Sequence, residues 1–359
     1  MRIRSCFVPA ACGFCIGLSS AALDTFGITQ MHPTKSGTRE WNSAHWANGT
    51  ARRVVYDGDA FDPTGWTDNH SSGDDSLYID GKGALRLKGA GPRFHINSTS
   101  QYSGSGPAQK APPQSFVNVE ATGYYRRLAT GGPAYAGAEI QVRTGPLAHG
   151  SSGGNACDAT GYAARFRDDG NWDFEKELKH PGSGVYSTKA GSGAPLFGAG
   201  TLPLGRWIGM KFLVYNLMDS NPGSAARTAA KTAAKTGAEE SPLVRLELYI
   251  DTVSDVDVAA PAGGGHWSLV GAMTDDGTNF PGGDVSGCPD LASNMAIPSG
   301  HGTVLLRTDN EACEWKRVSV REIEAVATAR ISIHPRRAPV RTPGPFLFPG
   351  YDALGREAP

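Results

Sequence analysis

The chain has 359 residues, a formal net charge of −1, 47 glycines and 24 prolines. A charge so close to zero argues against a nucleic-acid or anionic-membrane surface as the partner. The Gly and Pro content, together with the near absence of sustained helical periodicity, predicts a turn-rich all-β protein. All-β folds of about 200 to 250 residues commonly form one domain.

The N-terminus has the pattern of an export signal. Arg2 and Arg4 supply positive charge, Phe7–Leu18 is a short apolar stretch, and Ser19–Ala22 offers the small residues that a signal peptidase accepts. This apolar stretch is too short to span a bilayer, and no later segment is long and apolar enough. We therefore expect residues 1–22 to be a signal peptide and the mature protein to be secreted, with a charge of about −3 once the two arginines are removed.

The cysteines and the glycosylation sequons are also consistent with secretion. Glycosylation is expected at the three Asn-X-Ser/Thr sequons, Asn48, Asn69 and Asn97. Outside the signal the chain keeps Cys157, Cys288 and Cys313, an odd number that suggests one disulfide and one free thiol. Cys157 and Cys288 both lie in Gly-rich loops, and we expect them to pair, whereas Cys313 lies at the start of a strand. No spacing fits a metal motif, so no cofactor is expected, and the presence of a structural calcium ion stays open.

Strand-like segments separated by turn signals recur along the chain, which is the pattern of a β-sandwich. The predicted strands are Ala84–Lys88, Val117–Arg127, Ala138–Thr144, Gly161–Arg167, Trp172–His180, Trp207–Asn216, Val244–Asp251, Trp267–Ala272, Thr303–Thr308 and Trp315–Glu322. An Ala/Lys/Thr-rich stretch within 219–242 has no apolar stripe and is expected to be a disordered insertion. We expect one β-jelly-roll domain over residues 23–324 and a disordered tail over 325–359.

A hairpin over Tyr162–His180 concentrates ionisable groups. Strand alternation places Trp172, Phe174, Lys176, Leu178 and His180 on one side, and Asp173, Glu175, Glu177 and Lys179 on the other. Because both sides carry ionisable groups, we interpret the hairpin as lining a polar groove. The alternative is an exposed hairpin with solvated charges.

Two later strands alternate more cleanly. Phe212 and Val214 point one way, and Lys211 and Tyr215 point the other. In the second strand Leu246, Leu248 and Ile250 form the apolar face, opposite a polar and aromatic strip of the kind that a sugar-binding cleft uses. That strip consists of Arg245, Glu247, Tyr249 and Asp251.

Several of these side chains have the chemistry needed to cleave a uronic-acid polysaccharide by β-elimination. Glu139, Gln141 and Arg143 alternate with apolar residues, so they are expected to project together. Arg143 and Gln141 suit neutralisation of the substrate carboxylate. His149 or His180 suits the base and Tyr215 the acid. The other candidate substrate-binding residues are Glu139, Arg165, Lys176, Glu177, Lys211, Glu247 and Tyr249.

Two other functions compete with the lyase. A glycoside hydrolase needs two carboxyl groups that straddle the scissile bond, and Glu177 with Glu247 is the candidate pair. The chain lacks the cluster of three acids on one strand face that is typical of many secreted glucanases. In a non-catalytic carbohydrate-binding module, Trp172, Tyr249 and the charged strips would only hold the glycan.

Five blocks of the sequence together resemble the concanavalin A-like lectin/glucanase superfamily. The blocks are Asp80–Gly89, Val119–Arg127, Gly205–Asn216, Val244–Asp251 and Trp315–Ile323. The resemblance spans roughly Phe26 to Ile323 and implies a jelly-roll sandwich of two antiparallel sheets that handles carbohydrate. Polysaccharide lyases are one branch of this superfamily, and their motifs are partly matched by Glu139–Arg143 and His149. We therefore expect a monomeric secreted jelly roll that acts on an acidic polysaccharide, first as a lyase.

Overall fold

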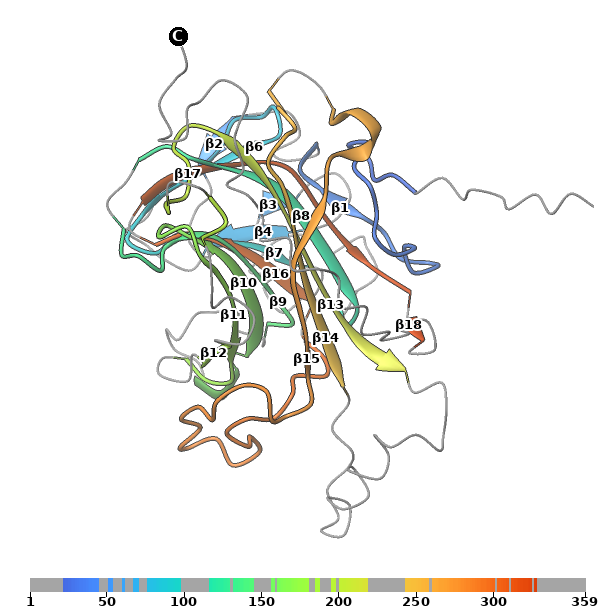
Figure 1. Ribbon diagram of the computed structural model, residues 1–359, viewed down its shortest axis with the longest axis vertical. Helices are drawn as coiled ribbons and strands as arrows, with labels where there is room; N and C mark the ends of the chain where they lie inside the picture. Colours follow the sequence, from blue (N-terminus) through green and yellow to red (C-terminus); the bar gives the residue numbers. More distant parts are fainter. Residues whose placement is uncertain are drawn as a thin grey trace, which may run out of the picture.

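The computed structural model consists of two β-sheets packed face to face (Figure 1). It describes residues 22–44, 51–53, 60–61, 67–70, 76–97, 116–129, 132–144, 156–158, 160–180, 185–187, 195–197, 200–218, 243–257, 260–300, 302–309, 311–324 and 326–327. Within these residues the strands pair antiparallel, apart from one two-residue strand. The predicted all-β sandwich is confirmed, and it has the architecture that the concanavalin A-like resemblance implies.

The larger sheet has ten strands in the described residues, in the order β15-β14-β13-β8-β17-β6-β5-β2, with β1 beside β17 and β18 beside β13. Their bounds are β1 Trp41–Asn42, β2 Arg52–Arg53, β5 Ser76–Ile79, β6 Ala84–Gly89, β8 Val119–Arg127, β13 Trp207–Met218, β14 Val244–Asp251, β15 Ser268–Asp275, β17 Glu311–Glu322 and β18 Val326–Ala327.

The smaller sheet has eight strands in the described residues, in the order β12-β11-β10-β9-β16-β7-β4-β3. Their bounds are β3 Ala60–Phe61, β4 Thr67–His70, β7 Arg93–Asn97, β9 Gly137–Val142, β10 Gly161–Arg167, β11 Trp172–Glu177, β12 Val185–Ser187 and β16 Thr303–Arg307.

The core lies between the two sheets and follows the period-two alternation of their strands. Ile140, Ala164 and Phe174 point inward from the smaller sheet, and they belong to the same buried cluster as Phe212 and Leu248 of the larger sheet. Phe174 stacks on Phe212 with ring centroids 5.8 Å apart. The alternate residues of each strand therefore project from the outer faces, where polar side chains gather.

All ten predicted strands form, with ends shifted by a few residues. The insertion within 219–242 and the signal segment lie outside the described residues. Two residues of the expected tail, Val326 and Ala327, pair with the end of β13. The rest of the tail also lies outside the described part.

The disulfide forms as predicted. Cys157 and Cys288 are joined with their Cα atoms 5.5 Å apart, and Cys313 is buried as a free thiol. Cys157 lies in a short 3-10 turn ahead of β10, and Cys288 lies in the long loop that follows β15. The bond therefore ties the smaller sheet to a loop that leaves the larger one.

An N-terminal segment, residues 22–40, packs against the outer face of the larger sheet, beside β8 and β17, and leads into β1 (Figure 1). The Met31 amide donates to Glu120, the Ser319 hydroxyl donates to Asp24, and Lys35 pairs with Glu322 at 2.7 Å. Much of the polar surface of that sheet is therefore covered by the chain itself.

Candidate functional site

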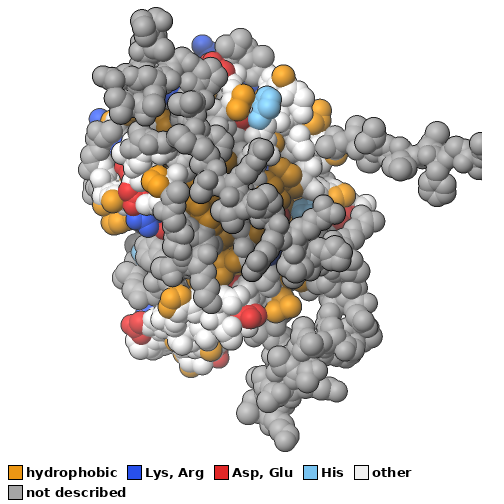
Figure 2. Space-filling model, in the orientation of Figure 1, with side chains coloured by type: hydrophobic (Ala, Val, Ile, Leu, Met, Phe, Trp, Pro, Cys, Tyr) orange, Lys and Arg blue, Asp and Glu red, His pale blue; other side chains and the backbone are white. Residues whose placement is uncertain are grey.

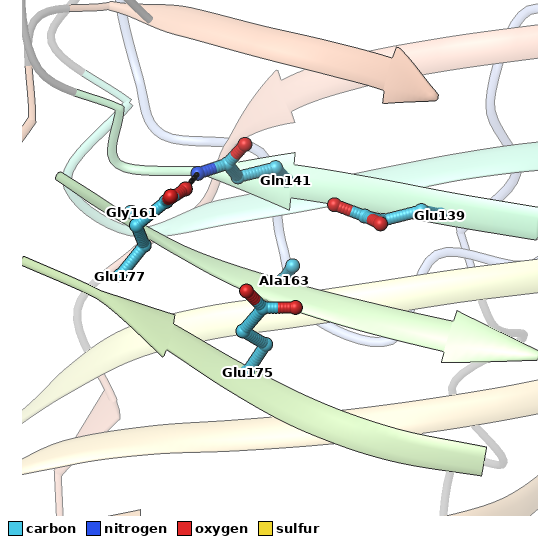
Figure 3. Close-up of a pocket in the computed structure, with 6 residues that line it drawn as sticks. All are labelled: Glu139, Gln141, Gly161, Ala163, Glu175 and Glu177. Carbon is cyan, nitrogen blue, oxygen red and sulfur yellow. Dashed lines mark hydrogen bonds between the residues drawn. The ribbon is translucent and has the colours of Figure 1, made fainter. Parts of the chain in front are cut away.

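The outer face of the smaller sheet carries a hollow over β9, β10 and β11. Figure 3 shows its six lining residues gathered on one side of these strands. They are Glu139, Gln141, Gly161, Ala163, Glu175 and Glu177. Its empty volume, counted together with the open solvent at its mouth, is about 140 Å³, and the side chains leave almost no water-sized space between them, so the hollow is shallow and tightly lined.

The hollow exists because the central strand has small residues where its neighbours have long ones. Ala163 on β10 pairs with Gln141 on one side and Glu175 on the other, and Gly161 pairs with Glu177. A Cβ atom at Gly161 would lie 2.4 Å from the Gln141 Nε2 atom, so the amide occupies the space that a side chain would fill.

The carboxylate of Glu177 joins two candidate residues. Gln141 Nε2 donates to Glu177 Oε2 at 3.5 Å, and His180 Nδ1 lies 2.6 Å from Glu177 Oε1. Strict alternation predicted His180 on the side opposite Glu177. The structure differs because β11 ends at Glu177, and the turn after it brings the imidazole back to the same carboxylate.

A row of arginines and carboxyl groups borders the hollow across four neighbouring strands, β11, β10, β9 and β16. Arg165 on β10 contacts Glu175 at 2.9 Å, Asp173 at 3.0 Å and Glu139 at 3.8 Å. On β16, which pairs with β9, Arg307 lies 3.6 Å from Glu139. Of the predicted substrate residues, Glu139 therefore lines the hollow and Arg165 borders it, and the two contact each other.

Glu175 has a raised pKa. Burial, together with the nearby carboxylates Glu139 and Glu177, raises its pKa to about 8, although the Arg165 guanidinium opposes the shift. At neutral pH this side chain is therefore mostly a neutral acid that can donate a hydrogen bond. Burial also raises the pKa of Glu139, against the effect of Arg307 and Arg165.

Arg143 does not project with Glu139 and Gln141, which corrects the prediction from alternation. Its backbone has a φ of 54°, in the left-handed region, and β9 ends one residue before it. The guanidinium is fully buried, where Nε donates to the Val117 carbonyl and Nη1 to the Ile297 carbonyl, both at 2.7 Å. The Arg143 side chain thus links the backbone at Val117 to the backbone at Ile297.

Lys176 is also directed away from the outer face. It points inward, as alternation predicts, and its ammonium lies 3.0 Å from Asp275 Oδ2 and 2.7 Å from the Asn294 carbonyl. The Tyr162 hydroxyl donates to the same Asp275 oxygen at 2.6 Å. Because this group is fully buried between the sheet and the loop after β15, Lys176 is not placed to bind a substrate on the outer face.

Four candidates lie on the outer face of the other sheet. They are Lys211, Tyr215, Glu247 and Tyr249. Both tyrosine hydroxyls donate to Glu247, at 3.0 Å from Tyr215 and 2.9 Å from Tyr249, and Arg245 Nε donates to it at 3.1 Å. Tyr215 therefore cannot share a substrate with His180, and Glu247 cannot pair with Glu177, because a complete sandwich separates them.

Lys211 is enclosed on that same face. Its ammonium donates to Glu120 and to Thr122, each at 2.7 Å, and Arg321 pairs with the other oxygen of Glu120. The N-terminal segment closes over this group through the Met31 amide. Its contacts make Lys211 part of the packing between that segment and the sheet.

Two further polar residues lie near the hollow and were not predicted. Arg307 on β16 and His95 on β7 occupy the outer face, because Leu305 pairs with Gln141 on one side and with His95 on the other. A sequence pattern could have identified His95. Phe94 and Ile96 alternate with Arg93, His95 and Asn97, which is the pattern of a half-buried strand.

The remaining candidates fall on residues about which less is described. His149 and Asn48 lie outside the described residues, and Asn69 and Asn97 are described only as strand backbone. No group of three or more His, Cys, Asp or Glu side chains in the described part is arranged to hold a metal ion. No helix in that part of the chain is long and apolar enough to cross a membrane.

Comparisons with known proteins give only distant structural likeness. No family model and no curated protein sequence matches the chain. The chain is similar to a putative glycosyl hydrolase from Parabacteroides distasonis, with 11% identity, a TM-score of 0.35, and coverage of 73% of this chain and 89% of that one. It is similar to a PL-14 alginate lyase from Aplysia kurodai, with 10% identity, a TM-score of 0.33, and coverage of 76% and 98%.

The exoplasmic/lumenal domain of VIP36 in its Ca²⁺-bound form is a third similar structure. It has 10% identity and a TM-score of 0.36, and the match covers 79% of this chain and 93% of that one. At these scores the site must be assigned from the geometry of this chain alone.

Proposed function

We propose that the chain is a secreted lyase that cleaves a uronic-acid-containing polysaccharide by β-elimination in the hollow of the smaller sheet. The observation that carries the proposal is the Glu177 carboxylate, which contacts both the Gln141 amide and the His180 ring. Secretion is supported by the signal-like residues 1–22 and by the disulfide, a bond that persists in oxidising compartments.

In this proposal His180 is the base. The Glu177 carboxylate on Nδ1 orients the ring, and Nε2 is then the basic nitrogen. It takes the proton from C5 of the uronate. The electron pair of that C–H bond forms the C4–C5 double bond, and the C4–O4 bond breaks. The imidazolium can return its proton to the leaving oxygen, a task that Tyr215 cannot perform from the opposite face.

The substrate carboxylate needs donors that stabilise its extra charge during proton abstraction. The Gln141 amide is one donor, and the protonated carboxyl group of Glu175 is the second. In this proposal these neutral donors have the role that the sequence predicted for Arg143, because the Arg143 guanidinium is hydrogen-bonded to backbone carbonyls.

The test is to mix the purified protein with polyglucuronate, polygalacturonate and alginate, and to follow both ultraviolet absorbance and new reducing ends. A lyase gives an unsaturated product whose absorbance rises together with the reducing ends. The proposal is overturned if reducing ends appear without that absorbance, or if neither signal appears on any uronate polymer.

A glycoside hydrolase is the second candidate, and the raised pKa of Glu175 favours it. Glu175 would be the general acid and Glu177 the partner carboxylate, in place of the pair Glu177 and Glu247. The two glutamates lie two residues apart on one strand face, which places their Cα atoms roughly 6 to 7 Å apart. Reducing ends without unsaturation would select this function. Retention on a polysaccharide column with neither signal would select a binding module.

The partners follow from the same proposal. We infer an acidic polysaccharide as substrate, no nucleic-acid or membrane partner, and a monomer in solution. In the space-filling view, charged side chains of both signs lie scattered over the described part of the face that is shown (Figure 2).

A further inference from the structure

A second and larger hollow lies on the outer face of the ten-stranded sheet, on the other side of the sandwich from Gln141. It encloses, together with the solvent at its mouth, about 480 Å³. The enclosed space itself is about 190 Å³, which is less than the about 300 to 1,000 Å³ that small-molecule sites commonly span, so the pocket has room for one small unit of a ligand. The lining residues that carry the argument are Arg126, Arg206, Trp207, Val253, Asp255 and Asp257.

The floor of this pocket is fixed by charged and aromatic contacts. The Arg126 guanidinium lies 4.3 Å from the centre of the Trp207 ring and pairs with Glu314 at 2.5 Å and with Asp257 at 2.8 Å. Lys316 pairs with the same Asp257 at 3.0 Å. Asp257 is thus held on two sides, while 46% of its side chain remains exposed at the pocket.

The wall of the pocket, residues 252–257, is anchored to the sheet by Asp251. This buried carboxylate accepts hydrogen bonds from the amides of Val253 and Ser254, at 2.9 and 3.1 Å, and from the Ser254 hydroxyl at 2.6 Å. At the end of the wall, Val256 is fully buried in a cluster with Trp207. The pocket is therefore preformed, and a ligand would not have to order it.

The chemistry of the lining fits a neutral sugar. Two arginines and two aspartates line the pocket, so it has no strong preference for an anion or a cation. Sugar hydroxyls both donate and accept hydrogen bonds, and neighbouring hydroxyls can satisfy a carboxylate or a guanidinium in pairs. Val253 and nearby Leu204, with exposed fractions of 67% and 55%, add apolar surface for the carbon face of a sugar ring.

We propose that this pocket binds a neutral saccharide unit through its hydroxyl groups, as a second carbohydrate site separate from the hollow of the smaller sheet. The proposal does not depend on lyase activity, because the two pockets share no residue. A polymer that contains both neutral and acidic sugars would then engage both faces of the molecule.

The experiment follows the indole N–H resonance of Trp207 in the nitrogen-15-labelled full chain, assigned by its absence in Trp207→Phe. The probes are cellotriose, mannotriose and xylotriose, with an oligoglucuronate as the acidic comparison. We expect at least one neutral trisaccharide to shift this resonance in a saturable way. We also expect Asp255→Ala to weaken that binding roughly tenfold, since a hydrogen bond to a charged group is lost.

Asp276→Ala is the matched control. Asp276 is an exposed turn aspartate that accepts the backbone N–H two residues ahead at 2.9 Å, as Asp255 does at 3.0 Å, but it lies outside the pocket. It should leave binding unchanged, and so should Glu177→Gln in the other hollow. The proposal is overturned if no neutral trisaccharide moves the Trp207 resonance, if only oligoglucuronate moves it, or if Asp255→Ala binds as well as the wild type.

Discussion

At the scale of single residues, the absence of a side chain at Gly161 shapes the candidate site. The Gln141 amide occupies the space above Gly161, and from there it reaches the Glu177 carboxylate. A donor held in this way is set before substrate arrives, which is the arrangement that favours electrostatic stabilisation of a transition state. The position of Gln141 is therefore open to a direct test.

Gly161→Ala should displace the Gln141 amide while the fold survives. The new Cβ would lie 2.4 Å from Nε2, which is the far end of a flexible side chain. We expect turnover to fall about 10- to 100-fold, because a misplacement of about 1 Å can have that effect, and the melting temperature to change little. Gly91→Ala, which meets only the ends of the Arg93 and Asp309 side chains, is the control. Full turnover in Gly161→Ala would show that the amide position does not matter.

Strand alternation in the sequence predicted the correct sheet face for some candidate residues and the wrong face for others. The local backbone explains each difference. Glu139, Gln141 and Glu177 share the outer face because their strands alternate regularly. Arg143 leaves that face because its backbone adopts a positive φ at the end of β9, and His180 joins it because β11 ends early. Alternation holds only while a strand continues, and the ends of strands are hard to locate from sequence.

At the scale of elements, the disulfide and Lys176 both help to tie β15 and the loop after it to the smaller sheet. The disulfide links Cys288 to Cys157, and Lys176 on β11 contacts Asp275 and the Asn294 carbonyl. These contacts join elements that lie far apart along the chain. The sequence indicated the disulfide, but it gave no sign that Lys176 would be used in this way, because the pairing of strands with a distant loop is a tertiary property.

Breaking the disulfide should destabilise the fold measurably. The bond closes a loop with a sequence separation of 131, for which the chain-entropy model gives at most about 4 to 5 kcal/mol. We expect the variant with both Cys157→Ser and Cys288→Ser to melt at a lower temperature, and a reducing agent to bring the wild type to the same value. Unchanged melting under both conditions would mean that the loop is held without the bond.

At the scale of the whole molecule, the two outer faces divide the polar residues into separate groups. Glu139, Gln141, Glu177 and His180 lie with one sheet, and the cluster around Glu247 lies with the other. The resemblance of strand blocks predicted the sandwich but not this division, because strand patterns tell which residues face outward without telling from which sheet.

Buried glutamates make overall stability depend on pH. Burial and neighbouring carboxylates raise the folded-state pKa of Glu175 to about 8 and that of Glu311 to about 7. The protonated forms are therefore favoured by folding. Their contribution is complete below the ordinary glutamate pKa and is lost as the pH rises through about 7 to 8.

The free energy of unfolding, measured by chemical denaturation, should fall between about pH 5 and pH 9 by a few kcal/mol at most. Glu175→Gln keeps a neutral side chain at every pH, so its curve should be flatter over the upper part of that range. A wild-type curve that rises with pH, or an equal slope in Glu175→Gln, would contradict the assignment of Glu175 as a neutral acid.

The most direct measurement compares two variants on opposite faces, His180→Ala and Tyr215→Phe, by the rate of unsaturated product formation from a uronate polymer. His180→Ala should lower the rate about 10²- to 10⁴-fold, as expected for loss of a general base, and should largely keep polymer affinity. Tyr215→Phe should keep the wild-type rate, since Tyr215 lies on the outer face of the other sheet. A wild-type rate in His180→Ala, or a comparable loss in Tyr215→Phe, would contradict the assignment of the site to the smaller sheet.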